Sequence, residues 1–367
     1  MLVFNKQGRL LPESYGFTLN IKSLQPTKHY CYLGLIFSAT GSLKPAIENL
    51  STKGKRACLA LKRTINSQAL SGWSLMKLFD HLIAPILTYG ASVWLPSTHA
   101  ARARTRGDPL DHKGYFKRLS TDQFERVHLG FLKWVLGVHN RATNTAVYGE
   151  TGRAPLSISV HQQCSKYFIR ALSKASDDQD FSLLALAVRE QRTLNLEWFD
   201  FWDSTLRIGG RDQLEHQHVL HWDALRSNQS KLSFFNTIKH EYGYSQYLDL
   251  RRQDRTHVAK LRLSAHDLLI ETGRYTGELR TCRYCVDRSN AVTLNQLPMA
   301  DPILEDETHA LFDCPEYEEL RENTPEPLQI ALKSKITSHI FNLELITPLN
   351  KFLAACRTHR SVSPGPG

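Results

Sequence analysis

Two short stretches decide how the C-terminal part of this chain folds: Cys282-Arg-Tyr-Cys285 and, 23 residues later, His309-Ala-Leu-Phe-Asp-Cys314. A Cys-x2-Cys turn lets two thiolates reach one ion at about 2.3 Å, and the His and Cys that follow complete a tetrahedral set. Four protein ligands close the site, so the ion would stabilise the fold rather than activate water. The sequence therefore predicts one structural Zn²⁺ ion. Ordinary thiols beside a surface histidine are the alternative, and the paired spacing favours the metal.

Other polar and sulfur-containing side chains bear on this site less directly. Four acidic residues near the ligands are candidates to accept hydrogen bonds from them, namely Asp287, Glu305, Glu307 and Asp313. Three cysteines stand among apolar residues and are predicted to be small core residues, namely Cys31, Cys58 and Cys164. Cys356 and His359 form a weak second candidate pair for a metal.

Composition limits the class of protein. The chain has 367 residues, of which 41% are hydrophobic and 10% aromatic, enough for two or three cores and too apolar for global disorder. The most apolar stretch, residues 75–95, contains charged residues and a proline, and no signal peptide opens the sequence. Seven scattered cysteines do not suggest a disulfide framework. We expect an intracellular protein, without distinguishing nucleus from cytoplasm, that has no membrane partner and no small-molecule substrate.

Charge is distributed unevenly along the chain. Residues 1–153 carry 21 Lys and Arg against 8 Asp and Glu, whereas residues 154–367 carry 25 against 28. A basic half joined to a near-neutral half indicates a polyanion, RNA or DNA, as the partner of the first half. Charge alone is a non-specific signal, because basic proteins of other kinds are common.

Periodicity predicts a mainly α-helical fold with a small N-terminal β-hairpin. Residues 1–5 and 30–37 are predicted strands. Apolar residues at helical spacing then predict a helix from about Pro45, a longer helix over 74–94 that Pro85 bends, and helices over 124–138 and 157–174. Residues 182–275 are mostly helical by the same pattern. The acidic run 176–180 is interpreted as a solvated turn between helices, because no hydrophobic strands flank it.

Three groups of residues are candidates for contacts with nucleic acid. Basic side chains could lie against phosphates, and aromatic rings could stack on bases. A solvated basic surface explains the same pattern almost as well. The first group lies on the helix after Pro45, the second in an exposed loop over 96–119 and the third around the first cysteine pair. They are Lys53, Lys55, Arg56, Lys62 and Arg63; Arg102, Arg104, Arg106, Lys117 and Arg118; and Arg274, Arg280, Arg283 and Tyr284.

Ordered motifs along the chain resemble the C-terminal part of non-LTR (LINE-type) retrotransposon reverse transcriptases. The similar stretches include Tyr32-Leu-Gly34, Ile83-Ala-Pro-Ile-Leu-Thr-Tyr-Gly90, Gly149-Glu-Thr-Gly152, Ile270-Glu-Thr-Gly-Arg274 and the cysteine and histidine pairs. Each stretch is a weak signal by itself, whereas the set occurs in the order found in that family.

The resemblance implies a division of the chain into parts. Residues 1–44 resemble the end of the polymerase palm, with Tyr32, Leu33 and Gly34 in a primer-grip-like hairpin. Residues 45–153 resemble a basic helical thumb, 154–250 a helical connector and 251–325 a zinc-knuckle-like module. Residues 326–367 are expected to form a C-terminal helix and a disordered tail.

The resemblance also implies what this chain does not do. In the family, the aspartates that hold the two catalytic metal ions precede the Tyr-Leu-Gly hairpin, as does the endonuclease. We therefore expect no enzymatic activity and a role in binding RNA or DNA as a truncated, non-catalytic part of such an enzyme. Two alternatives stay open: a subunit that completes a separately encoded palm in trans, and a decayed element fragment without function.

Overall fold

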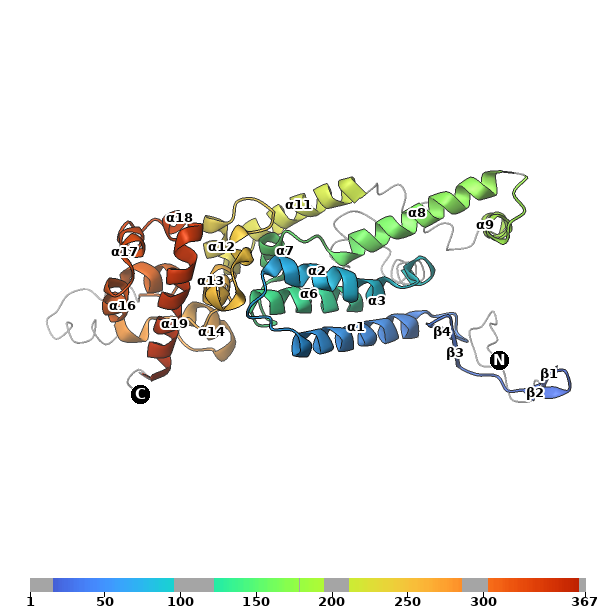
Figure 1. Cartoon of the computed structure of the whole chain (residues 1–367), viewed down its shortest axis with the longest axis horizontal. Coiled ribbons are helices and arrows are strands. Elements are labelled where there is room, and N and C mark those ends of the chain that lie inside the picture. The colour runs from blue at the N-terminus through green and yellow to red at the C-terminus, as the bar shows by residue number, and fades with distance from the viewer. Residues whose placement is uncertain (1–15, 96–121, 178, 195–210, 286–302, 363–367) are drawn as a thin grey trace. The chain divides into compact units, whose positions relative to one another are not determined.

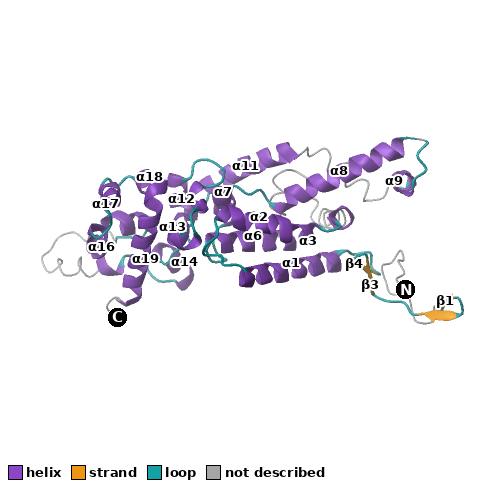
Figure 2. Ribbon diagram, viewed as in Figure 1, coloured by secondary structure: helices purple, strands orange, loops and turns teal. Residues whose placement is uncertain are grey.

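The computed structural model describes residues 16–95, 122–177, 179–194, 211–285 and 303–362 (Figure 1). Within these ranges the protein is mainly α-helical, and its strands all lie near the N-terminal end (Figure 2). This confirms the predicted fold class. The predicted strand over residues 1–5, the basic loop over 96–119 and the end of the tail fall outside the described residues. None of the described helices combines the length and the hydropathy that crossing a membrane requires.

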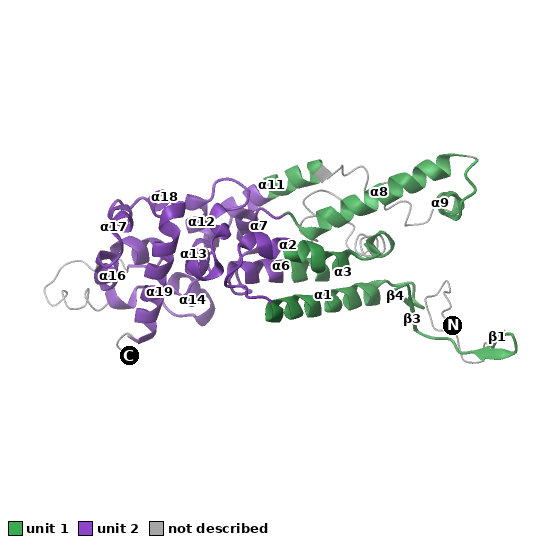
Figure 3. Cartoon of the chain, in the orientation of Figure 1, with its two compact units in different colours: residues 1–64, 78–128, 154–221 green, residues 65–77, 129–153, 222–367 purple. Residues whose placement is uncertain are grey.

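The chain divides into two compact units, each built from separate stretches of sequence (Figure 3). Unit 1 comprises residues 1–64, 78–128 and 154–221, and unit 2 comprises residues 65–77, 129–153 and 222–367. Both units thus join segments that are distant in sequence. The division into five consecutive parts that the resemblance implies stays a prediction.

Two short antiparallel hairpins open the described chain. Strands β1 (Phe17–Leu19) and β2 (Lys22–Leu24) form the first, and β3 (His29–Tyr32) and β4 (Leu35–Ser38) form the second. The prediction of a single strand over 30–37 is wrong, because a two-residue turn divides it. Leu33 and Gly34 have φ values of 46° and 83°, the positive values that a type I′ turn requires. Cys31 is exposed on β3, so its assignment to the core is also wrong.

A long basic helix, α1 (Lys44–Thr64), packs against a short one, α3 (Ala84–Thr88), in unit 1. Gly54 makes this approach close, because a Cβ atom there would lie 2.4 Å from Leu87 Cδ2. The buried face of α1 is Ala46, Leu50, Ser51, Gly54 and Cys58. Before α3, α2 (Gly72–Leu82) ends, and Pro85 stands in the first turn of α3, where its missing N–H costs no hydrogen bond. The helix is therefore interrupted just before Pro85, whereas the sequence predicted one helix over 74–94 that bends at this residue.

Two further helices, α8 (Leu156–Ser176) and α9 (Leu183–Thr193), lie in unit 1, and α6 (Gln123–Leu136) passes from unit 1 into unit 2 after residue 128. Glu125 of α6 is fully buried and caps α8, because its Oε2 accepts hydrogen bonds from the backbone N–H and the hydroxyl of Ser157 at 3.2 and 3.3 Å. Its Oε1 lies 2.8 Å from Nδ1 of His128, whose ring stacks on Phe79. The acidic run after α8 is a turn to α9 with Asp177 exposed, as predicted.

Short helices surround one continuous core in unit 2. Apolar side chains such as Phe235, Leu248, Val258, Leu328 and Leu349 fill it and are at most 1% exposed. The helices are α7 (Asn144–Thr151), α12 (Ser233–Ile238), α13 (Thr256–Arg262), α14 (Leu269–Thr276), α16 (Glu318–Glu322), α17 (Glu326–Lys333), α18 (Thr337–Ile340) and α19 (Ile346–Val362), with α11 (Arg211–Ser227) spanning the boundary to unit 1. Single 3-10 turns connect them: η1 (Ser230–Leu232), η2 (Gln246–Asp249), η3 (Arg252–Asp254), η5 (Pro315–Tyr317) and η6 (Leu343–Leu345).

A buried ion pair ties α7 to α13 inside this core. Arg262 donates two hydrogen bonds to Glu150, from Nε to Oε1 at 2.6 Å and from one terminal nitrogen to Oε2 at 3.2 Å. Burial opposes ionisation of Glu150, but the guanidinium outweighs it and lowers the pKa of the carboxyl. The Arg262 guanidinium also lies over the rings of Tyr247 and Phe341. Each buried charge is thus neutralised by a hydrogen-bonded partner of opposite sign.

Candidate metal centre

A short antiparallel pairing brings the two cysteine-containing stretches together in unit 2. Thr281 bridges Leu304, and hydrogen bonds run from Cys282 N–H to Ile303 O at 2.8 Å and from Glu305 N–H to Arg280 O at 2.8 Å. The Cys-x2-Cys stretch then turns, with Cys285 N–H donating to Cys282 O at 3.2 Å. This pairing sets both thiols against the segment that begins at residue 303.

The second pair of ligands lies on a π-helical turn, η4 (His309–Asp313). Cys314 N–H donates to His309 O at 2.8 Å, a hydrogen bond that spans five residues. Such turns occur mostly as isolated bulges and frequently at functional sites. Asp306, which precedes the turn, accepts the His309 N–H through its side chain at 2.8 Å. The four-residue gap between His309 and Cys314 is therefore closed by this wide turn, which presents both side chains to the cysteine pair.

The four predicted ligands meet in one buried cluster. One ligand atom from each of Cys282, Cys285, His309 and Cys314 lies within 4.8 Å of all the others, and all four residues are buried. The Cys282 and Cys314 Sγ atoms are 3.8 Å apart, too far for a disulfide, and Cys285 Sγ lies 3.5 Å from Nε2 of His309. A tetrahedron with bonds of about 2.3 Å to sulfur and 2.0 Å to nitrogen has edges of about 3.8 and 3.5 Å. The residues therefore fit one metal ion.

Electrostatics within the cluster favour a thiolate. Hydrogen bonds with the Cys314 thiol and with His309 lower the pKa of Cys282. The same shared proton raises the pKa of Cys314, and the neighbouring Cys282 raises the pKa of His309. Thiolates are the form of cysteine that binds metals.

Two buried carboxylates anchor the ligand segment to other elements. Glu305 accepts the Leu269 N–H at 2.8 Å and pairs with Arg360 of α19. Glu307 accepts hydrogen bonds from the Ser264 hydroxyl at 3.2 Å and from His266 Nε2 at 2.9 Å. Burial alone would raise the pKa of Glu307, but the hydrogen bonds it accepts and the charge of His266 together outweigh burial and lower the pKa.

Among the described residues, the structure gives Asp313 and His359 partners other than the four ligands. Asp313 pairs with Lys335 at 2.5 Å, and Asp287 lies outside the described residues. Asp306, which the sequence analysis did not single out, supports the His309 backbone instead. His359 pairs with Glu316 at 2.9 Å, and burial raises the pKa of Cys356 to about 12, so these two residues serve the packing of α19.

The residues predicted to contact nucleic acid are dispersed over both units. On α1, Lys53, Lys55, Arg56 and Arg63 are exposed, and Lys62 is half-buried. In unit 2, Arg280 and Arg283 are exposed. Three members of this group contact other side chains of the protein, and one of them is Arg283, which pairs with Glu278 at 3.6 Å. Arg274 is half-buried beside Glu271 at 3.3 Å, and the half-buried Tyr284 ring packs edge-on against Tyr317. The loop residues are outside the described ranges, namely Arg102, Arg104, Arg106, Lys117 and Arg118.

The primer-grip-like residues form the tip of the second hairpin in unit 1. Tyr32 and Leu33 are 58% and 72% exposed, and the Tyr89 hydroxyl donates to Leu33 O at 2.7 Å. A Cβ atom on Gly34 would lie 3.4 Å from the Tyr89 ring. The turn is thus supported from one side and presents its side chains on the other.

A second basic cluster in unit 2 combines residues that sequence reasoning did not connect. The half-exposed Tyr275 ring lies between Arg141, 4.6 Å from its centroid, and Lys231, 5.5 Å away. The nearby Lys133 is buried, and burial together with Lys231 lowers its pKa to about 8. The only signal in the sequence is an aromatic residue among basic ones at 274–275, because the other members lie about 45 and 135 residues upstream.

Comparisons with known proteins identify no relative of this chain. No protein-family model matches it, and neither the curated proteins nor the solved structures include a significant match. The geometry of the site therefore carries the functional argument.

Proposed function

We propose that this chain binds RNA or DNA without catalysing a reaction, and that one structural zinc ion organises unit 2. The observation that carries the proposal is the buried set of three thiols and one imidazole at the edge lengths of a tetrahedron. Soft sulfur ligands in tetrahedral geometry select zinc over harder ions. Four protein ligands leave no open position for water, which supports a structural rather than a catalytic role.

Exposed basic side chains support a polyanion as the partner. Lys53, Lys55 and Arg56 lie on one turn of α1, and none of them has an ion-pair partner within 4 Å in the described part of the chain. In unit 2, Arg141 and Lys231 lie against the half-exposed Tyr275 ring, and Lys231 also pairs with Glu271 at 3.1 Å. Sites for single-stranded nucleic acids combine cations, which neutralise phosphates, with aromatic rings, which stack on bases.

The origin of the chain belongs to the same proposal. The ordered motifs support descent from the C-terminal part of a non-LTR retrotransposon reverse transcriptase, with α1 in the position of the thumb. The exposed tip of the β3–β4 hairpin supports this reading, since a primer grip has to present its turn to a nucleic-acid end.

A salt series on the zinc-loaded chain tests binding. Labelled 20-nucleotide RNA and DNA single strands and a DNA duplex are titrated by fluorescence anisotropy between 50 and 300 mM NaCl. With about five phosphates neutralised, the log–log slope is expected to be about −4. In the triple variant Lys53→Gln, Lys55→Gln, Arg56→Gln the slope should become shallower by about 2, from about −4 to about −2.

A variant of a cation that is already paired within the protein serves as the control. Lys174→Gln removes a cation that already pairs with Asp180 at 3.3 Å, so the slope should not change. A flat salt response, or no binding to any of the probes, would contradict the proposed function.

A further inference from the structure

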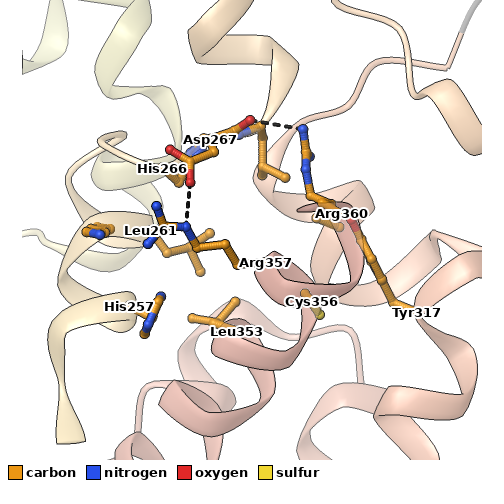
Figure 4. A pocket seen from close by; sticks show the side chains of 12 residues that line it. His257, Leu261, His266, Asp267, Tyr317, Leu353, Cys356, Arg357 and Arg360 are labelled. Carbon is orange, nitrogen blue, oxygen red and sulfur yellow. Dashed lines mark hydrogen bonds and ion pairs between the residues drawn. The ribbon is translucent and has the colours of Figure 1, made fainter. Parts of the chain in front are cut away.

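A cavity in unit 2 lies beside the metal centre, between α13 and α19, with the segment 266–268 at its edge (Figure 4). Its volume is about 70 Å³. Since one water needs about 10–15 Å³, about five waters would fill it, which is close to the size of one six-membered ring. Its wall is mostly apolar and includes Leu261, Leu268, Ala310, Tyr317, Leu353 and Cys356.

Cations gather at the mouth of this cavity. Arg357 pairs with Asp267 at 2.8 Å, and Arg360 donates to Asp267 O at 2.9 Å, as the dashed lines in Figure 4 show. Lys260 lines the same mouth and has no ion-pair partner within 4 Å among the described residues. Burial, together with the charge of Arg357, lowers the pKa of Lys260. An incoming anion would therefore find a cation that the protein itself leaves without a close counter-charge.

We propose that this cavity receives one base of a single-stranded nucleic acid, with the flanking phosphates on Lys260 and Arg357. The inference rests on the proposed function and assigns it a site. A nucleotide unit joins a flat ring to an anion, and an apolar cavity below a cationic rim is complementary to that combination. The apolar wall offers stacking rather than hydrogen-bond readout, so the site accepts different bases.

The metal centre supports one wall of the cavity. Ala310 follows the ligand His309, and Tyr317 lies on the turn that follows the ligand Cys314. Arg321 reinforces this segment by donating to Cys314 O at 2.6 Å. The ion thus contributes to the shape of the cavity, and stripping it should weaken base binding as well as the fold.

Two probes of equal charge test the proposal on the full zinc-loaded chain. They are a labelled thymidine decamer and a decamer of abasic deoxyribose phosphates. The thymidine decamer should bind about tenfold more tightly, because only it can place a base in the cavity. In Leu353→Trp the indole fills the cavity, so the two affinities should fall within about twofold of each other.

A second variant and a control complete the test. Lys260→Met keeps the aliphatic stem. It should weaken the binding of both decamers and make the log–log salt slope shallower by about 0.7. Lys351→Gln removes an exposed cation of α19 that does not line the cavity, and it should keep the tenfold preference.

Two results would overturn the proposal and leave the proposed function standing. They are equal binding of both decamers by the wild type, and a thymidine preference that persists in Leu353→Trp. Failure of both decamers to bind while the 20-nucleotide RNA or the DNA duplex still binds would overturn this site alone, whereas failure of every probe would overturn the proposed function and this site with it.

Discussion

The two units keep their buried polar groups in different ways. Unit 2 holds opposite charges in pairs, as in Glu150 with Arg262, and gathers four metal-binding side chains around one point. Unit 1 buries several histidines, one of which, His128, lies 2.8 Å from the buried Glu125. Burial lowers the pKa of His161 and His218 to about 4, so both are neutral at pH 7.

This difference has consequences for stability. A charge pair or a metal cluster is sensitive to the loss of one member, because the partner is left buried and uncompensated. A neutral buried histidine is sensitive to acid, because the unfolded chain binds the proton more readily. Unit 2 should therefore depend on its partners and unit 1 on pH.

Metal removal should give the largest effect, and in unit 2 alone. Structural zinc contributes about 10 kcal/mol or more to the folding of isolated zinc fingers. Chelation should therefore speed hydrogen exchange in residues 303–317 by at least about 10³-fold. Peptides of α8 and α9 in unit 1 serve as the internal control and should keep their protection. Equal loss in both units, or in neither, would remove the contrast.

Glu150→Ala should be the most damaging single substitution away from the metal. It leaves the Arg262 guanidinium buried without its carboxylate, which costs about 3–5 kcal/mol. The matched control is Asp254→Ala, which breaks an exposed arginine pair with Arg251 and should cost under about 1 kcal/mol. Urea denaturation of the zinc-loaded protein measures both. Similar midpoints for the two variants would show that the buried pair is not special.

Acid should weaken unit 1 through its histidines. Their folded pKa of about 4 lies below the unfolded value of about 6.5, so their contribution is complete above pH 6.5 and is lost as the pH falls toward 4. At pH 5 the loss is about 2 kcal/mol for each histidine. Hydrogen exchange of α8 peptides at pH 7 and pH 5, corrected for intrinsic rates, measures it. His161→Phe should remove about half of the loss, and an unchanged pH dependence would contradict this account.

Close helix packing should matter in both units, with smaller effects. A Cβ atom on Gly54 of unit 1 would meet Leu87 at 2.4 Å, and one on Gly149 of unit 2 would meet the Trp222 ring at 2.5 Å. Gly54→Ala and Gly149→Ala should each cost about 1–3 kcal/mol. Gly130→Ala on α6 has no atom within 4 Å of the new methyl group, so it should be neutral or stabilise by about 1 kcal/mol. Thermal unfolding of the three variants tests this ranking.

The metal centre was predictable because its chemistry is local in sequence. Two ligand pairs with short internal spacing need only one long-range contact, which the Thr281–Leu304 pairing supplies. Helix positions were predictable for the same reason, since the irregularity at Pro85 and the buried face of α6 depend on neighbouring residues, although the sequence predicted a bend at Pro85 and the structure has a break. The local pattern missed the turn at Leu33-Gly34, because the aromatic residues on either side together form one apolar run, whereas the resemblance implied a hairpin there.

The rest of the site depends on contacts that no local pattern encodes. Arg141, Lys231 and Tyr275 meet only when three distant segments pack together. The cavity likewise needs α13 and α19, which lie about 90 residues apart. The exposure of charged residues such as Lys53 can be predicted from the sequence, but their binding partner cannot. A solvated helix face and a phosphate-binding helix face have the same composition.

Metal content of the purified chain tests the central claim most directly. We expect one zinc ion per wild-type chain by elemental analysis, none in Cys314→Ser and one in Cys356→Ser, which alters a buried cysteine of the same unit outside the cluster. Absence of metal from the folded wild type, or its retention by Cys314→Ser, would contradict a zinc-centred unit 2.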